Sequence, residues 1–497
     1  MSRGPSRRTL LLTAALATAA APLAAFPAHA AARTPKVLVI GLDGALLDRI
    51  EDAGAPHLGA LMAAGLTAPS TLYAEPLAPT VSGPGWSTVL TGVWPDKHRV
   101  TDNTFAGHAL DRYPDFLTRV ETARPGASTY AVASWAPVTT TILSPAVDTR
   151  VSTPADEYDT GTTRRAVAEL RDGDRDAVVV HLDNIDHAGH SDGAASEAYL
   201  AAVRTADAQI GEMVAAVAAR PSYAAEDWLI MVTSDHGHTP AGGHGGNTLA
   251  ERQTFLIARG GGVPAGTTRH DVRMPDVAAS ALHHLGIAIP DAWELDGRPL
   301  QTPVSDAFDT LRPELRTRAD ETGIDPALLG FTLTPPAGWA VENGAMGDGG
   351  VGEWRGWTFT TDAFWTSAER GQQRESNLRA RDVFAVADGD EWADKPFTGT
   401  FDSTLVTPPW PVTGGSPAVL RYTTYYRHEA PQRAEVLVSY DGAPPALVKT
   451  YTADTPSRTE KLTLQVPPGA RNAQIRFRYT AGNNWFWTVD AVSLTAS

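Results

Sequence analysis

The sequence predicts an α/β protein with a doubly wound, mostly parallel sheet, followed by an all-β sandwich domain. Three observations support this fold class. Short apolar runs alternate with helical patterns through the first 300 residues, as in βαβ proteins. Each of these runs is followed by polar residues. Beyond residue 330 lie eight of the 13 tryptophans, together with runs that alternate between apolar and polar residues, which indicates a separate all-β domain.

The first domain is expected from three strand-like segments and one helical segment. Residues 36–42, 177–182 and 228–233 are short apolar runs of the kind that form buried parallel strands. Residues 194–219 carry apolar side chains at helical spacing. Ligands of such sheets bind at the carboxyl ends of the strands, so we expect the three segments that follow the strands to meet there.

The second domain is expected from two further strand patterns. Residues 435–440 and 474–479 read as strands, and Asp441-Gly442 is a hairpin-type turn signal. We interpret this region as an antiparallel β-sandwich, jelly-roll-like in type. A composition change and prolines near residue 335 set the predicted boundaries. These are a first domain at 31–305, a linker at 306–335 and the sandwich at 336–497.

The first 30 residues are expected to be a signal peptide. Arg7 and Arg8 precede an apolar stretch, and Ala28-His29-Ala30 matches a signal cleavage site. The paired arginines resemble the twin-arginine signal, which exports folded proteins; an ordinary secretory signal is the alternative. No other apolar run approaches the ~20 residues of a membrane-spanning helix. The expectation is therefore a secreted protein without a transmembrane anchor.

Charge and cysteine content exclude several classes of function. The formal net charge of −16 argues against a nucleic-acid duplex as partner. With no cysteine in the chain, disulfides, thiolate metal sites and a cysteine nucleophile are excluded. An acidic protein that handled anionic phosphate would need local positive charge, which bound metal could supply.

Six aspartates and histidines that follow the predicted strands form a candidate metal-ligand set. They comprise Asp43, Asp186, His190, Asp235, His236 and His244. Three aspartates and three histidines would equip two zinc-like sites, each with three protein ligands and one open position. Each motif alone is more often a loop or a satisfied polar group. Their joint occurrence after parallel strands favours two-metal chemistry.

Ser82 is the candidate nucleophile. Pro84 suits the first turn of a helix, which would put Ser82 near the helix start, where backbone N–H groups favour a developing anion. Alternatively, Ser82 only caps the helix, a role that serine commonly fills. Ser87, inside the helix, and Thr80, before the turn, are poorer candidates.

The order of these motifs resembles the alkaline phosphatase superfamily, in particular its type I phosphodiesterase and nucleotide pyrophosphatase branch. The resemblance covers residues 36 to 302 and includes Thr80-Val81-Ser82-Gly83 and Ser234-Asp235-His236-Gly237. It implies an alkaline phosphatase-like sheet and assigns Asp43, Asp235 and His236 to the metal that holds the nucleophile Ser82. To the second metal, which faces the leaving group, it assigns Asp186, His190 and His244.

The resemblance also implies how the phosphoryl group is bound. Asn103 matches a branch asparagine that donates a hydrogen bond to a phosphoryl oxygen; a plain turn residue is the alternative. The backbone N–H of Gly83 is expected to assist it. The expected metal is zinc, and the expected intermediate is a phosphoserine.

Two departures from the branch pattern stand out. Only seven residues separate His236 from His244, where nucleotide pyrophosphatases carry a long insertion. This leaves His238 as a rival for the last ligand position, although His244 is favoured by its glycine surroundings. Ser82-Gly83-Pro84-Gly85-Trp86 resembles the sulfatase motif, but Trp86 replaces its arginine. His98, His187 and His238 are interpreted as partners of metal ligands or as pocket residues.

The C-terminal region gives weaker signals. Asp388-Gly389-Asp390-Glu391 could bind calcium through oxygen ligands, although an exposed acidic turn is the commoner reading of such a run. Tryptophans such as Trp485 and Trp487 are expected in the core, with carbohydrate or surface binding as the alternative.

The function predicted from sequence is a secreted two-metal hydrolase of small-molecule phosphate esters, diesters or nucleotide pyrophosphates. A phosphomonoesterase or sulfatase on the same scaffold is the first alternative; a monoesterase would need an added cation, for which Arg99 is the candidate. A non-catalytic surface-binding protein that acts through the β-sandwich is the second.

Overall fold

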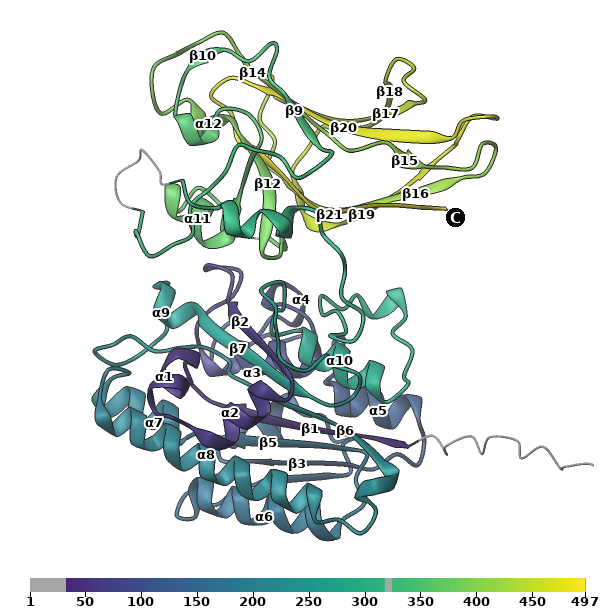
Figure 1. Ribbon diagram of the computed structural model, residues 1–497. Coiled ribbons are helices and arrows are strands. Elements are labelled where there is room, and N and C mark those ends of the chain that lie inside the picture. Colours follow the sequence, from purple (N-terminus) through teal and green to yellow (C-terminus); the bar gives the residue numbers. More distant parts are fainter. Residues whose placement is uncertain (1–32, 318–323, 377, 497) are drawn as a thin grey trace, which may run out of the picture.

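The protein consists of an α/β domain and an all-β domain stacked on it (Figure 1). The computed structural model describes residues 33–317, 324–376 and 378–496. The export signal expected at residues 1–30 lies outside these residues. Among the described residues, no helix combines the length and apolar character needed to cross a membrane.

An eight-stranded sheet forms the centre of the α/β domain, in the order β4-β3-β5-β1-β6-β7-β2-β8. The strands are β1 (Thr34–Leu42), β2 (Leu66–Thr71), β3 (Thr129–Ala133), β4 (Thr149–Ser152), β5 (Ala177–Leu182), β6 (Glu226–Thr233), β7 (Gln253–Arg259) and β8 (Thr267–Thr268). Strands β4, β3, β5, β1 and β6 are parallel, and β7 runs antiparallel to both of its neighbours. The predicted, mostly parallel α/β fold is therefore confirmed.

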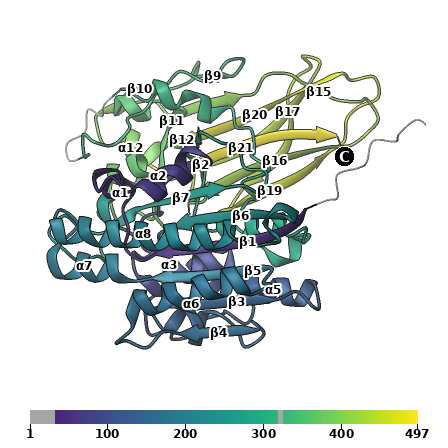
Figure 2. The same cartoon turned by 60° about the horizontal axis from the view of Figure 1, so that its bottom comes forward.

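Helices cover both faces of this sheet (Figure 2). They are α1 (Leu47–Asp52), α2 (Pro56–Ala63), α3 (Ser82–Thr91), α4 (Pro95–His98), α5 (Phe116–Ala123), α6 (Tyr158–Asp172), α7 (Asn184–Asp192), α8 (Glu197–Ala218), α9 (Leu249–Arg252) and α10 (Asp276–His284). Along β1, Val37 and Val39 pack into the core beneath α3, α5 and α10, whereas Leu38 and Ile40 pack beneath α2, α6 and α8. Burial on both faces explains why this strand is apolar throughout.

Two antiparallel sheets form the C-terminal domain, one in the order β11-β12-β21-β16-β19 and the other in the order β18-β17-β20-β14-β9 with β15 beside β20. Their strands are β9 (Ala340–Glu342), β11 (Thr358–Thr361), β12 (Val383–Asp388), β14 (Phe401–Val406), β15 (Trp410–Pro411), β16 (Ala418–Tyr426), β17 (Arg433–Tyr440), β18 (Ala446–Tyr451), β19 (Thr455–Leu464), β20 (Asn472–Ala481) and β21 (Phe486–Ala496). A small pair, β10 (Asp348–Gly349) and β13 (Phe397–Thr398), and the helices α11 (Asp362–Ala368) and α12 (Gly389–Trp392) complete the domain. The two large sheets share one apolar core, so the predicted all-β domain is confirmed.

Local sequence signals explain several features of this domain. Asp441 (φ 48°) and Gly442 (φ 79°) take the left-handed backbone of the hairpin turn between β17 and β18. Five tryptophans are fully buried in the core, namely Trp354, Trp357, Trp365, Trp392 and Trp487. Trp485 is partly buried beneath Arg427, whose guanidinium lies 4.5 Å from its ring centre. These rings therefore serve mainly as core.

Part of the segment expected as a linker is structured against the C-terminal domain. Phe308 and Leu311 lie in a 3₁₀ helix, Phe308–Glu314, and are buried in the core of that domain. Further along, Thr332 forms a bridge with Phe359 of β11. The two domains also meet directly through ion pairs, which include Arg252 with Asp362 at 2.5 Å and Arg381 with Asp276 at 2.7 Å.

Asp309 in this segment should make stability depend on pH. Burial, followed by repulsion from Asp306 and Asp382, raises the pKa of Asp309 to about 8, and its Oδ1 accepts a hydrogen bond from Val383 N at 3.2 Å. The folded chain then holds a proton that the unfolded chain releases above about pH 4. The contribution to stability is complete below about pH 4 and is lost as the pH rises through about 8.

We therefore expect the parent protein to lose more stability than Asp309→Asn as the pH rises from 4 to 8. The difference in slope should reach at most about 1.4 kcal/mol per pH unit. Denaturant unfolding at a series of pH values measures it. Asp325→Asn, at an exposed position of the same region, is the matched control and should keep the parent slope. Parallel pH profiles for the parent and Asp309→Asn would contradict the assignment.

Candidate functional site

The segments that follow β1, β5 and β6 meet at the carboxyl edge of the sheet. Asp43 comes directly after β1, and Asp235 and His236 directly after β6. Asp186 lies in the first turn of α7, after β5. Because β1 pairs in parallel with both β5 and β6, these three connections necessarily emerge side by side.

Asp43, Asp235 and His236 form one compact, buried group. One ligand atom from each lies within 4.8 Å of the others. His236 Nε2 lies 3.2 Å from Asp235 Oδ2 and 3.5 Å from Asp43 Oδ1. Neither carboxylate oxygen has a hydrogen-bond partner within the described residues. Burial raises the pKa of Asp43 and of Asp235 well above the ordinary range, and mutual repulsion adds to the shift of Asp43.

The donor set of this group fits a divalent metal ion. Buried polar atoms without partners are rare, because each loses its hydration without compensation. Two carboxylate oxygens and an imidazole nitrogen that face one point are ligands of the kind that zinc takes. The ring orientation agrees with this, since His236 Nδ1 faces the carbonyl of Gly237 at 3.2 Å and leaves Nε2 for the site.

The second oxygen of Asp43 is held by two side chains outside the candidate set predicted from the sequence. Asp43 Oδ2 accepts hydrogen bonds from Trp86 Nε1 at 2.8 Å and from His181 Nε2 at 3.0 Å. A side chain at Gly41 would clash with the Trp86 ring, so Gly41 provides the space for it. These contacts direct the free Oδ1 of Asp43 toward the site. The one sequence signal for His181 is its position as the only polar residue in an otherwise apolar strand.

A second group surrounds Asp186. His190 Nε2 lies 3.4 Å from Asp186 Oδ2, and His244 Nε2 lies 3.4 Å from Asp186 Oδ1 and 3.0 Å from His190 Nε2. His244 Nδ1 is 2.7 Å from the carbonyl of Thr80. Because this carbonyl accepts the hydrogen of Nδ1, the other ring nitrogen, Nε2, is free to bind an ion. The structure thus brings all three residues expected of the second site together, with His190 as the most exposed of them.

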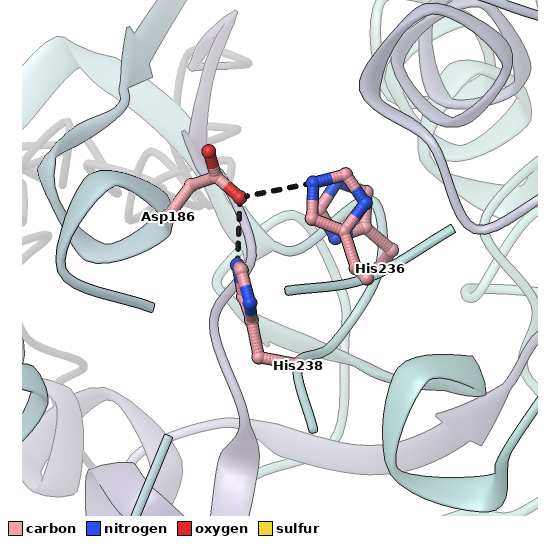
Figure 3. A group of neighbouring side chains, drawn as sticks. Asp186, His236 and His238 are labelled. Atoms are coloured by element: carbon pink, nitrogen blue, oxygen red, sulfur yellow. Dashed lines mark hydrogen bonds and ion pairs between the residues drawn. The ribbon is translucent and has the colours of Figure 1, made fainter. Parts of the chain in front are cut away.

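His238 lies in this group as well and contacts Asp186 more closely than the other histidines do. Its Nε2 is 2.7 Å from Asp186 Oδ1. Figure 3 marks this contact with a dashed line. The ring is fully buried, and an added side chain at Gly44 or Gly189 would overlap it. Glycines at these two positions therefore make room for the imidazole.

The other two histidines near the motifs lie elsewhere. His98 is buried, and burial lowers its pKa to about 3. Its Nε2 is hydrogen-bonded to Thr88 Oγ1, and its Nδ1 accepts a hydrogen bond from Val100 N–H. His187 is exposed on the outer side of α7, with its ring centre 6.4 Å from that of Tyr158. Of the three, only His238 contacts a candidate ligand.

Ser82 is the first residue of α3, and its hydroxyl faces the first group. Ser82 Oγ lies 3.4 Å from His236 Nε2. The N-cap position is taken by Val81, and no side-chain capping hydrogen bond is present. The alternative interpretation, that Ser82 caps the helix, is therefore not supported by the local geometry.

Asn103 lies beside Ser82 in a different arrangement from the one expected. Its Oδ1 accepts a hydrogen bond from Gly83 N at 2.7 Å. The Gly83 N–H thus holds the carboxamide of Asn103, and the Nδ2 of Asn103 has no partner among the described residues. In the structure the Gly83 N–H therefore positions Asn103, whereas the sequence predicts that it binds the phosphoryl group.

The acidic turn of the C-terminal domain is occupied by an arginine. The guanidinium of the fully buried Arg374 lies 3.0 Å from Asp388, 3.2 Å from Asp390 and 2.7 Å from Glu391. It takes the place that a cation would need. Within the described residues, the side-chain groups that could hold a metal ion all belong to the α/β domain.

Comparison with known proteins identifies relatives of the α/β domain. The type I phosphodiesterase / nucleotide pyrophosphatase family matches residues 37–308. Human ectonucleotide pyrophosphatase/phosphodiesterase family member 7 is 27% identical over 262 residues, which cover 48% of this chain and 54% of that protein. GPI ethanolamine phosphate transferase 2 of Eremothecium gossypii is 33% identical over 102 residues, 20% of this chain and 12% of that protein. The matched part of the chain thus covers about an eighth of the length of the transferase and about half of the length of the human protein.

Solved structures with a similar arrangement include murine ectonucleotide pyrophosphatase / phosphodiesterase 5, with a TM-score of 0.40, 15% identity and coverage of 51% of this chain and 96% of that one. Another is the phosphonate monoester hydrolase of Agrobacterium radiobacter, with a TM-score of 0.40, 17% identity and coverage of 54% of this chain and 76% of that one.

The family match covers more than half of the 497 residues. The chain belongs to the type I phosphodiesterase / nucleotide pyrophosphatase family.

Proposed function

We propose that this protein is a metal-dependent phosphoric ester hydrolase that cleaves small phosphodiesters or nucleotide pyrophosphates through a phosphoserine at Ser82. The observation that carries the proposal is the buried group of Asp43, Asp235 and His236, in which two carboxylate oxygens lack partners and His236 Nε2 lies 3.4 Å from Ser82 Oγ. The family match supports the reaction class.

Two divalent ions, which we expect to be zinc, would supply the charge that lowers the pKa of the serine hydroxyl and stabilises the leaving oxygen. Asp43, Asp235 and His236 would hold the first ion beside Ser82; Asp186, His190 and His244 would hold the second. Calcium is not part of the proposal, because Arg374 already neutralises the acidic turn.

The chain's own residues then carry out two displacements. Ser82 Oγ gives up its proton to solvent and attacks phosphorus in line, so that an O–P bond forms while the bond to the leaving alcohol or phosphate oxygen breaks. Asn103 Nδ2 donates to a phosphoryl oxygen, and Gly83 N–H fixes the carboxamide in that orientation. Water subsequently attacks the phosphorus of the phosphoserine, the bond from phosphorus to Ser82 Oγ breaks, and the phosphate product leaves while Ser82 Oγ regains a proton.

A panel of chromogenic diester, monoester and sulfate substrates tests the reaction class. We expect the highest kcat/KM for the diester. Faster turnover of the monoester or sulfate would favour the first alternative. Failure to turn over any of them, in protein with a full complement of metal, would favour a binding protein that acts through the β-sandwich, where carbohydrate or surface binding remains a prediction.

We propose His238 as a positioning residue for Asp186. Its Nε2–H donates to Asp186 Oδ1 and so orients the carboxylate toward the second ion. His238→Ala should weaken retention of one of the two ions by about 10- to 100-fold, as loss of such a partner usually does. Chelator competition measures this affinity directly. His187→Ala is the control, because His187 is exposed on α7 and contacts no candidate ligand, and equal affinities in the two variants would contradict the role.

We propose residues 31–305 as the catalytic domain, since all candidate ligands and both apolar cores of the sheet lie within them. This fragment should fold and turn over a small diester. Its Tm should be lower than that of the full chain, because Arg252 and Asp276 lose their buried partners. A folded fragment without activity would show that the β domain helps to build the site.

We also propose that the chain is secreted, by the twin-arginine route. Replacement of both Arg7 and Arg8 by lysine should block export, and unchanged export would argue for the ordinary secretory route.

A further inference from the structure

We propose that the groove between the two domains binds a small molecule with at least two phosphate or sulfate groups. The groove is a cavity of about 680 Å³ between the face formed by β16 and β19 and a wall that includes α4 and the segment after α10. In Figure 1 these two strands lie on the side of the C-terminal domain that faces the α/β domain. This site is separate from the candidate metal ligands, none of which lines it.

Most charges along the groove neutralise one another. Arg379 pairs with Asp96 at 2.6 Å and with Asp296 at 2.9 Å, and Lys97 also contacts Asp296 at 2.7 Å. On the sheet side, Glu460 is shared by Arg458 and Lys449. These carboxylates are therefore unavailable to the other cations of the groove.

Three lining cations remain without an ion-pair partner among the described residues, namely Arg298, Arg421 and Lys461. Among the described residues that line the groove, Asp291 is the one carboxylate without an ion-pair partner. The unpaired cations therefore outnumber the unpaired carboxylates, and the groove has an excess of positive charge. Burial and the neighbouring Arg381 lower the pKa of Arg298, and Asp490 and Asp276 offset only part of this shift. An anion in the groove would relieve this unfavourable environment.

Arg421 and Lys461 lie directly opposite each other on adjacent strands. Like charges in this position destabilise a sheet. Lys461 is on the edge strand β19, where a lysine can serve simply to prevent strand pairing between molecules. Arg421 is on the inner strand β16, so edge protection does not explain it. A shared anionic ligand explains both residues.

Hydroxyl groups complete the site on the same face. Leu420 and Tyr422 point into the core, so Arg421 and Thr423 point into the groove. Thr459 is the register partner of Thr423 and lies next to the Arg421–Lys461 pair. Guanidinium forks, an ammonium group and hydroxyls together match tetrahedral oxyanions, whether phosphate or sulfate.

Titration calorimetry of the full metal-loaded chain tests the proposal, with Ser82→Ala as background to prevent turnover. The probes are a sugar bisphosphate and a disulfated disaccharide, with the uncharged disaccharide as negative control. We expect binding of at least one charged probe that weakens as the salt concentration rises. The arm that binds shows whether the groove takes phosphate, sulfate or both.

Arg421→Gln combined with Lys461→Gln should weaken that binding about tenfold or more, as expected for loss of charge-assisted hydrogen bonds. Arg433→Gln is the matched control, because Arg433 is an exposed arginine on strand β17, outside the groove. The charge-conserving pair Arg421→Lys and Lys461→Arg should keep most of the affinity. Unchanged affinity in the Gln double variant, or no preference of any probe over the uncharged disaccharide, would overturn the proposal.

Discussion

Replacing Ser82 with alanine should reduce turnover of a diester by roughly 10⁴-fold or more, because a covalent route cannot proceed without its nucleophile. The free energy of unfolding should change by less than about 1 kcal/mol, since the hydroxyl makes no capping hydrogen bond. Steady-state kinetics and denaturant unfolding of the same preparation measure both quantities.

Ser87→Ala is the matched control for this experiment. Ser87 lies on the same helix, is fully buried, and its Oγ has no hydrogen-bond partner within the described residues. Its removal should leave turnover near the parent value. Ser82→Thr should retain more activity than Ser82→Ala, because it keeps a hydroxyl. Comparable activity in Ser82→Ala and Ser87→Ala would exclude Ser82 as nucleophile.

Metal removal should have an effect of similar size. The purified chain should hold about two divalent ions and lose nearly all activity to a chelator, as open sites with three protein ligands do. The chelated protein should also unfold at a lower temperature, since Asp43 Oδ1 and Asp235 Oδ2 then remain buried without partners. Elemental analysis and thermal unfolding measure the two effects.

A single-ligand variant separates the two sites. Asp235→Asn should lose the ion beside Ser82 and reduce turnover by several orders of magnitude. Asp207→Asn is the control: Asp207 is equally buried, but its carboxylate accepts hydrogen bonds from His57 N and Leu58 N at the start of α2. This variant should keep both ions. Full activity of metal-free protein would contradict the two-metal account.

Local sequence patterns were sufficient to predict three strands of the sheet, β1, β5 and β6, and the convergence of the segments that follow them. The run 177–182 has the same bounds as β5, and the expected strand at 435–440 lies within β17. Both strands could be predicted because a short apolar run or an alternating pattern directly indicates which side chains are buried. Asp43 and Asp235 come together because parallel strands necessarily end at one edge.

Contacts between distant segments could not be predicted in this way. His181 and Trp86 hold Asp43 across separations of 138 and 43 residues, and no local pattern links either residue to Asp43. The same holds for Arg374, which neutralises an acidic turn that by itself resembles a cation site. The sequence marks His238 as a rival ligand, but its contact with Asp186 depends on how α7 packs beside the loop after β6.

The stereochemistry at phosphorus tests the proposed phosphoserine most directly. A chiral thiophosphate diester, hydrolysed in isotopically labelled water, yields a product whose configuration can be assigned. Two in-line displacements, the first by Ser82 Oγ and the second by water, predict net retention. Net inversion would mean that water attacks the diester directly, and it would contradict a covalent role for Ser82 even if both metal sites proved real.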